Sequence, residues 1–169
     1  MTSTPQVHTL AHNEGASYWF LGTLITLKAS AKTTNGAFSL IEQVAPVGFA
    51  PSKHVHHGED EAFYILDGEL TFFLDERTLQ VSTGTYLYLP REVPHSFRVE
   101  GTAPARLLQW TYPAGLEQFF VELGVPTNDL SVPPPAPAEV MQESIGRLLA
   151  LAPKYQLDIL GPPPGMEAR

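Results

Sequence analysis

Residues 54–68 read HVHHGEDEAFYILDG, and this stretch decides the fold. His54 and His56 are two residues apart, so on a β-strand both imidazoles project from the same face. Glu61 begins the apolar run that follows, and alternate residues of that run share its face. The stretch therefore predicts two neighbouring strands that turn imidazole and carboxylate groups toward an apolar interior.

A third imidazole belongs to the same pattern. His95 opens a later alternating run, in which Phe97 and Val99 share its face. Three neutral imidazoles and one carboxylate on inward faces would form a site for one divalent transition metal, held by His54, His56, Glu61 and His95. Four protein ligands leave octahedral positions open for water, substrate or dioxygen.

The chain contains no cysteine, which excludes disulfides and thiolate ligands and leaves nitrogen and oxygen as the metal-binding atoms. These donor types alone do not choose among nickel, manganese, iron, cobalt, copper and zinc. The metal identity therefore stays open at this point.

Short apolar or alternating runs separated by turn residues surround these positions and predict the strands of a single β-sandwich or barrel. Asp67-Gly68 predicts a two-residue hairpin because both residues tolerate positive φ, and Asn35-Gly36 indicates another such turn. The predicted runs are 18–27, 38–44, 61–66, 70–74, 78–81, 85–89, 95–99 and 106–111.

The pattern differs at the two ends of the chain. After Pro113 two amphipathic helices are predicted, the first ended by Gly124 and Pro126, followed by an extended proline-rich tail. The helical faces consist of Leu116, Phe119, Phe120 and Leu123, and of Met141, Ile145, Leu148, Leu149 and Ala152. We thus expect an N-terminal arm (1–16), a barrel (17–113) and a helical segment with its tail (114–169). The helical segment would pack on the barrel or on a dimer partner, or form a lid.

The composition excludes several classes of partner. The chain has 169 residues, 43% hydrophobic and 17% charged, with a net charge of -8. Such an acidic protein is not expected to bind nucleic acid or anionic membranes, because the phosphates would repel it. No secretion signal and no apolar stretch near the ~20 residues of a spanning helix is found, so we expect a soluble cytoplasmic protein.

The glycines and ligands together resemble a known family. Gly48, His54, His56, Glu61 and Gly68 match the first motif of the cupin superfamily in residue type and spacing, and Gly84, Pro90 and His95 match its second motif. The sequence departs from the second motif at Glu92, where glycine is usual, and at Val99, where asparagine is frequent. The resemblance implies an all-β jelly-roll barrel, the double-stranded β-helix of cupins, with two C-terminal helices.

Longer segments resemble the bacterial single-cupin quercetin dioxygenases. These are the segments 18–22, 54–64, 90–98 and 160–163. The resemblance implies a metal-dependent dioxygenase that cleaves the heterocycle of a planar aromatic flavonol with O2 and releases carbon monoxide. It also implies a homodimer. Two alternatives stay open: another metal-cupin enzyme, such as an enol or diketone dioxygenase or a sugar isomerase, and a non-catalytic small-molecule-binding cupin.

Several side chains near the ligands have competing interpretations. Glu61 would be either a fixed ligand or a general base whose pKa is raised toward neutrality by apolar surroundings. Phe63, Ile65 and Phe97 either contact an aromatic substrate or simply fill the barrel. Glu59 and Asp60 are expected to be loop charges that face solvent. His57 would point away from the metal, as a surface residue or one that supports a ligand.

Overall fold

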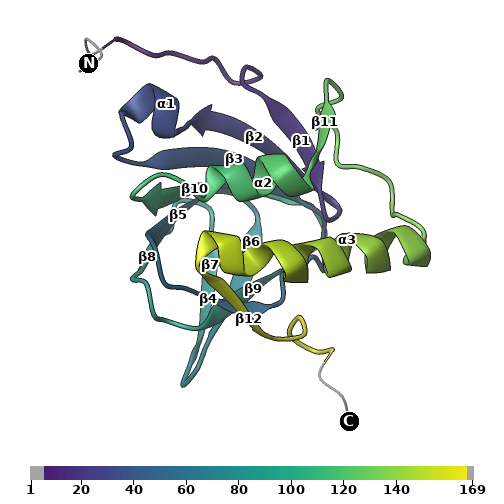
Figure 1. Ribbon diagram of the computed structural model, residues 1–169. Helices are drawn as coiled ribbons and strands as arrows, with labels where there is room; N and C mark the ends of the chain where they lie inside the picture. Colours follow the sequence, from purple (N-terminus) through teal and green to yellow (C-terminus); the bar gives the residue numbers. More distant parts are fainter. Residues whose placement is uncertain (1–5, 167–169) are drawn as a thin grey trace.

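Two antiparallel β-sheets make up most of the computed structural model, which describes residues 6–166 (Figure 1). The seven-stranded sheet has the order β11 (Val125–Thr127), β1 (Ser17–Phe20), β2 (Thr23–Ala29), β3 (Ser39–Ala45), β10 (Ala105–Tyr112), β5 (Asp60–Asp67) and β8 (Tyr86–Leu89). The five-stranded sheet has the order β12 (Leu157–Gly161), β4 (Lys53–His56), β9 (His95–Val99), β6 (Glu69–Leu74) and β7 (Thr78–Ser82). The predicted all-β jelly-roll architecture is confirmed.

The predicted hairpin at Asp67-Gly68 is wrong. β5 lies in the seven-stranded sheet and β6 in the five-stranded sheet, so the chain passes between the sheets at this point. Gly68 does have a positive φ of 97°, and a Cβ built on it would lie 2.8 Å from the Cα of Ala105. The glycine is required for a close approach at this corner, and the positive φ alone could not distinguish a corner from a hairpin.

Two other turns also differ in detail from the prediction. The run 18–27 consists of two strands, β1 and β2, which pair across a turn at Leu21-Gly22. Asn35-Gly36 ends the short helix α1 (Ala31–Thr34), with φ values of 54° and 81°. β2 and β3 are antiparallel neighbours, but a helical turn rather than a two-residue hairpin connects them.

The apolar interior forms two clusters. The floor cluster lies between the two sheets and consists of Ala45, Phe63, Ile65, Leu70, Phe72, Val81, Leu89, Phe97, Val99, Ala105 and Leu107. The cap cluster combines the seven-stranded sheet with C-terminal elements and consists of Phe20, Ile25, Ile41, Leu116, Phe119, Phe120, Ala152 and Leu157. Along β3, Ala45 belongs to the floor and Ile41 to the cap, with the buried Gln43 between them. A polar layer therefore separates the two clusters.

Both predicted C-terminal helices are present. In α2 (Glu117–Leu123), the rings of Phe119 and Phe120 lie 5.9 and 5.0 Å from that of Phe20. The helix α3 (Ala138–Leu151) has no fully buried side chain, and Ile145 and Leu149 are exposed although they belong to its predicted apolar face. A short 3-10 helix, η1 (Ala152–Tyr155), follows α3.

The last strand, β12, was not predicted. Only an extended tail from Gly161 onward was expected, whereas Leu157–Gly161 pairs with β4 along its length. The first five residues of the predicted arm and residues 167–169 of the tail lie outside the described residues. No helix within residues 6–166 is both long and apolar enough to cross a lipid bilayer.

Candidate metal centre

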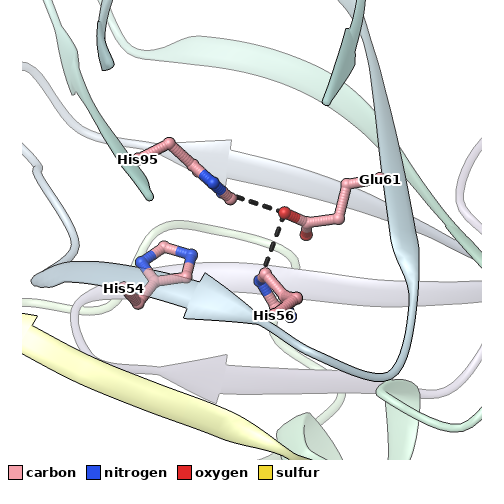
Figure 2. A group of neighbouring side chains, drawn as sticks. All are labelled: His54, His56, Glu61 and His95. Atoms are coloured by element: carbon pink, nitrogen blue, oxygen red, sulfur yellow. Dashed lines mark ion pairs between the residues drawn. The ribbon is translucent and has the colours of Figure 1, made fainter. Parts of the chain in front are cut away.

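The structure brings the four predicted ligand residues together (Figure 2). β4 supplies His54 and His56, and β9 supplies His95, which is the direct pairing partner of His54. Glu61 comes from β5 in the opposite sheet. One candidate ligand atom from each side chain lies within 4.8 Å of the other three. The four groups thus converge on one point between the sheets.

Each imidazole is oriented by an acceptor at its Nδ1 atom. The Nδ1 of His54 lies 2.7 Å from the carbonyl oxygen of Ser52, and that of His95 lies 2.9 Å from the carbonyl oxygen of Val93. A carbonyl oxygen can only accept, so both Nδ1 atoms carry the proton. Their Nε2 lone pairs are then free to bind a cation.

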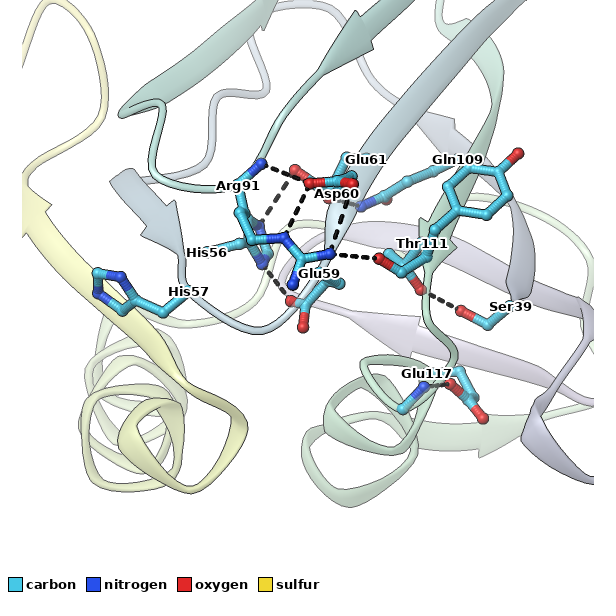
Figure 3. Close-up of polar contacts among 12 residues, drawn as sticks. Ser39, His56, His57, Glu59, Asp60, Glu61, Arg91, Gln109, Thr111 and Glu117 are labelled. Carbon is cyan, nitrogen blue, oxygen red and sulfur yellow. Dashed lines mark hydrogen bonds and ion pairs between the residues drawn. The ribbon is translucent and has the colours of Figure 1, made fainter. Parts of the chain in front are cut away.

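His56 is held by a carboxylate instead of a carbonyl. Its Nδ1 lies 2.6 Å from an Oε1 of Glu59, whose side chain is buried (Figure 3). The expectation that Glu59 faces solvent is therefore wrong. The tight turn after His56 places the Glu59 carboxylate at the Nδ1 edge of the imidazole ring, where it fixes the ring orientation and increases the basicity of the ring.

Glu61 presents one oxygen to the imidazoles and the other to an amide. Its Oε2 lies 2.9 Å from the Nε2 of His95 and 3.2 Å from the Nε2 of His56, and the side-chain amide of Gln109 donates to its Oε1. The side chains of Glu61, His95 and His56 are almost completely buried, with 1%, 3% and 4% of their residue surface exposed.

These three buried atoms lack hydrogen-bond partners of acceptable geometry among the described residues. Buried polar atoms are nearly always satisfied in native proteins, so the orphaned Nε2 and Oε2 atoms indicate an additional partner. A divalent cation at their meeting point would satisfy all of them with nitrogen and oxygen donors. The residues fit a metal ion.

The electrostatics of the cluster are strongly coupled. Burial, together with the charges of His95 and His56, lowers the pKa of His54 to about 3. Burial also lowers the pKa of His56, but the charge of Glu61, the hydrogen bond that His56 donates to Glu59 and the close contact with Glu61 outweigh it and raise the pKa to about 10.

Glu61 itself is ionised. Burial raises its pKa, but the charge of His56 and the close contacts of His56 and His95 with its Oε2 hold the pKa well below its usual range. This pKa agrees with the alternative of an ionised ligand and not with the raised pKa expected of a general base. The apolar surroundings exert the expected effect, yet the neighbouring imidazoles dominate.

Asp60 also differs from the expectation of a solvated loop charge. The Arg91 guanidinium and backbone N–H both donate to it, at 3.0 and 2.9 Å (Figure 3). The hydrogen bonds from Arg91 lower the pKa of Asp60 to about 2. The pair connects the start of β5 to the loop that precedes His95, so it helps to fix two ligand-bearing segments relative to each other.

The polar residues around Glu61 on β10 were not predicted from the sequence. The side-chain amide of Gln109 donates to the Oε1 of Glu61. Thr111 pairs in register with Glu61 across the two strands and forms a hydrogen bond of 2.5 Å with Ser39. Both are inward positions of β10, in register after the apolar Leu107. A break from apolar to polar residues on one strand face was the available signal.

The predicted substrate-pocket residues all lie in the floor cluster. Phe63, Ile65 and Phe97 are buried, and the Phe63 ring lies 5.2 Å from that of Phe72 and 6.4 Å from that of Phe97. They pack against other side chains of the barrel. A role in substrate contact stays a prediction.

His57 points away from the metal cluster, as expected. Its side chain is partly exposed and binds two carboxylates, those of Glu92 and Asp158. Glu92, which replaces the usual motif glycine, has a positive φ of 67°. A non-glycine residue therefore holds the left-handed conformation that glycine would adopt without strain.

Comparison with known proteins agrees with this fold. Residues 40–111 match the cupin domain family. Over 149 residues, 88% of its length, the chain is 29% identical to quercetin 2,3-dioxygenase of Bacillus subtilis (strain 168), of which it covers 44%. It is 37% identical over 78 residues, 45% of its length, to Protein SchB of Streptomyces halstedii, of which it covers 56%. The chain thus spans about half the length of these curated relatives.

Solved structures show the same architecture. KdgF from Halomonas sp. aligns with a TM-score of 0.57 and 12% identity, covering 66% of this chain and 99% of that protein. The polyketide cyclase RemF from Streptomyces resistomycificus aligns with a TM-score of 0.56 and 18% identity, covering 63% and 80%. At these identities the likeness concerns the fold alone. Residues 40–111 thus match the cupin domain family on a jelly-roll fold, and the chain is similar to quercetin 2,3-dioxygenase.

Proposed function

We propose that the protein is a metal-dependent dioxygenase of the quercetinase type, which cleaves the heterocycle of a flavonol with O2 and releases carbon monoxide. The observation that carries the proposal is the convergence of imidazole Nε2 atoms and the Glu61 Oε2 on one buried point. The similarity to quercetin 2,3-dioxygenase over most of the chain supports this reaction class among the cupin enzymes.

In this proposal His54, His56, His95 and Glu61 hold one divalent transition metal, drawn from nickel, manganese, iron, cobalt, copper and zinc. When bound, such an ion supplies Lewis acidity, which makes a coordinated hydroxyl easier to deprotonate. The protein's own contribution is to fix the donors: the carbonyls of Ser52 and Val93 and the carboxylate of Glu59 hold the three rings.

Glu61 is the proposed acceptor for the proton of the flavonol 3-hydroxyl. A carboxylate with a low pKa accepts a proton efficiently only from an acidic donor, so Glu61 needs a substrate hydroxyl that is already acidified. Gln109 holds Oε1 and leaves Oε2 as the atom that either binds the metal or takes the proton. In this proposal Glu61 binds the metal through Oε2 at rest and takes the proton of the substrate through the same atom during turnover.

The overall reaction balances without another co-substrate. Both atoms of O2 enter the organic product, the heterocycle opens, and one of its carbons leaves as carbon monoxide. The buried floor cluster beside Glu61 would exclude water, which limits competing hydrolysis and strengthens electrostatic interactions in the site.

Oxygen uptake with quercetin tests this function directly. The metal-free protein is reloaded separately with nickel, manganese, cobalt, iron and copper, and oxygen consumption and carbon monoxide are measured. We expect metal-dependent uptake with carbon monoxide released in equal amount. If no metal supports uptake, the proposed reaction is wrong, and another metal-cupin activity or a binding role takes its place.

Glu61→Gln separates the ligand role from the proton-accepting role. Glutamine keeps an oxygen donor but cannot take up the proton, so we expect metal content to survive largely and turnover to fall about a hundredfold or more. Metal content by elemental analysis and turnover by oxygen uptake are compared with Glu76→Gln, a change in the exposed β6–β7 turn. Joint loss of metal and activity would show that Glu61 acts chiefly as a ligand.

We further expect a homodimer in the cytoplasm. The outer strands of both sheets carry backbone groups that can pair with a second barrel, and closed symmetric dimers are the commonest assemblies. A monomeric mass in light scattering would contradict the dimer.

A further inference from the structure

The metal centre is enclosed by apolar side chains from two directions. On one side, Phe63 and Phe97 of the floor cluster are the next inward residues after Glu61 and His95 on their strands. On the other side, Ile41 of the cap cluster pairs in register with Gln109. Among the four ligands His54 is the partly exposed one, and it lies on the side of β12, so access is expected from this side.

The C-terminal strand β12 forms the wall beside the two histidines of β4. Leu157 pairs in register with His56, and Ile159 pairs with His54. Directly paired residues of antiparallel strands project to the same face, so both apolar side chains line the same interior as the imidazoles. Leu157 is buried and belongs to the cap cluster.

Among the strands near the ligands, β12 is the one whose displacement would disturb the barrel least. It is the outermost strand of its sheet and pairs only with β4, whereas β5 lies between β10 and β8. It is also the last strand of the described chain. The helix α3 that leads to it has no fully buried side chain. Local opening of segments with few buried contacts, such as α3 and the strand that follows it, costs little free energy.

A polar latch, defined here as Glu92, His57 and Asp158, holds this strand in place. The His57 Nδ1 lies 2.8 Å from an oxygen of Glu92, and its Nε2 lies 3.0 Å from the Oδ2 of Asp158 in β12. The latch thus connects β12, through the residue that follows β4, to the loop before His95.

Backbone contacts reinforce the same connection. The N–H of His57 donates to the carbonyl of Gln156 at 2.9 Å, and the N–H of Glu92 donates to the carbonyl of His56 at 2.9 Å. Glu92 keeps its side chain at a position with positive φ, where glycine would be free of strain. The carboxylate at this position is well explained by its contact with His57.

From these contacts we propose that β12 is the movable wall of the metal centre. Leu157 and Ile159 form its inner surface and limit what reaches the ligands, and the latch residues are positioning residues that set how readily the wall opens. This inference rests on the metal binding proposed above. The apolar inner surface suits an apolar substrate better than a sugar phosphate, which would need cationic groups.

Hydrogen exchange on the metal-free protein tests the latch independently of the metal. Glu92→Gly keeps the turn conformation and removes one carboxylate, and Asp158→Asn removes the other charge. We expect amide exchange in β12 to speed up about tenfold or more in each variant, while β5 and β10 stay unchanged. Glu76→Gln serves as the control. Unchanged exchange in β12 in both variants would refute the latch.

A reversible crosslink tests whether the wall controls access. Because the chain has no cysteine, Lys53→Cys with Gly161→Cys would create a single disulfide between β4 and β12. The two positions are paired in register, and a Cβ on Gly161 meets no atom within 4 Å. Neither residue contributes to the proposed metal or latch groups.

The readout is the rate at which a chelator removes metal from the crosslinked and the phosphine-reduced forms, after equal metal content is verified. We expect the crosslink to slow removal about tenfold or more and reduction to restore the rate. Equal rates with the disulfide formed would show that β12 is not the route of access. If neither the crosslinked nor the reduced form binds metal, the proposed metal site is wrong. The hydrogen-exchange result would then test the latch without reference to the metal.

Discussion

The floor cluster and the cap cluster lie on opposite sides of the candidate ligands, but they are assembled from different parts of the chain. The floor is built from strands of both sheets between β3 and β10, with Phe63, Phe72 and Leu107 almost wholly buried. The cap joins Phe20 and Ile25 near the N-terminus to Ala152 and Leu157 near the C-terminus. Its outer helix, α3, leaves Ile145 and Leu149 exposed.

This difference suggests that the two clusters have different roles on the two sides of the polar layer that holds the ligands. The floor provides the rigid, dry base that holds Glu61 and His95 in position. The cap provides the side from which the site can open, because its helix α3 has no fully buried side chain and its last strand lies at a sheet edge. Four substitutions test this comparison.

The largest effect is expected from His95→Ala, which breaks the polar layer itself. The change removes one imidazole and leaves the Glu61 Oε2 without its nearest neighbour. We expect loss of essentially all bound metal, measured by elemental analysis after dialysis, while circular dichroism stays close to that of the parent. His12→Ala, in the exposed arm, is the matched control. Full occupancy in His95→Ala would contradict the proposed ligand set.

Phe72→Ala tests the rigidity of the floor. Phe72 has no exposed surface and its ring contacts those of Phe63 and Phe97. Removing a buried aromatic ring leaves a cavity and costs about 3–5 kcal/mol of unfolding free energy. Urea denaturation of the metal-free protein measures this loss. A cost below about 1 kcal/mol would mean that the floor repacks easily and is not the rigid side.

Gln109→Leu tests whether the hydrogen bond from Gln109 to Glu61 in the polar layer contributes to metal affinity. Leucine preserves the approximate volume but leaves the Glu61 Oε1 without its amide donor. Loss of such a supporting hydrogen bond typically weakens metal affinity about 10- to 100-fold, with the fold retained. Competition with a metal-sensitive dye gives the affinity. An unchanged affinity would show that Glu61 needs no support from Gln109.

The smallest effect is expected from Leu148→Ala in the cap. Leu148 is only partly buried against the cap cluster, so its truncation should cost about 1 kcal/mol of unfolding free energy. Urea denaturation beside Phe72→Ala makes the comparison direct. If Leu148→Ala cost as much as Phe72→Ala, the cap would be as tightly built as the floor.

The sequence predicted most of the floor and of the ligand set because both depend on local alternation. His54, His56 and Glu61 lie within one short stretch, and the inward positions of β5 and β9 follow a period of two. The glycine and histidine spacing shared with cupins placed His95 with them. These signals are carried by neighbouring residues and survive without knowledge of the tertiary structure.

The cap and the polar supports depend on contacts that are distant in the chain. β12 is a short strand after a helix, and only its pairing with β4 defines it. Glu59 was expected to face solvent because runs of acidic residues usually do. Instead its carboxylate is buried, where it accepts a hydrogen bond from the Nδ1 of His56. Asp67-Gly68 has the composition of a hairpin turn, but the strand that follows it lies in the other sheet, so the chain turns a corner between the sheets at this point.

The most direct test of a metal centre between the two clusters is an anomalous diffraction map from crystals of the metal-loaded protein, recorded at the absorption edge of the metal. We expect one strong peak per chain, bound by the Nε2 atoms of His54, His56 and His95 and by the Oε2 of Glu61. A peak at another position, such as the exposed carboxylates around His57, or no peak at these four side chains, would contradict it.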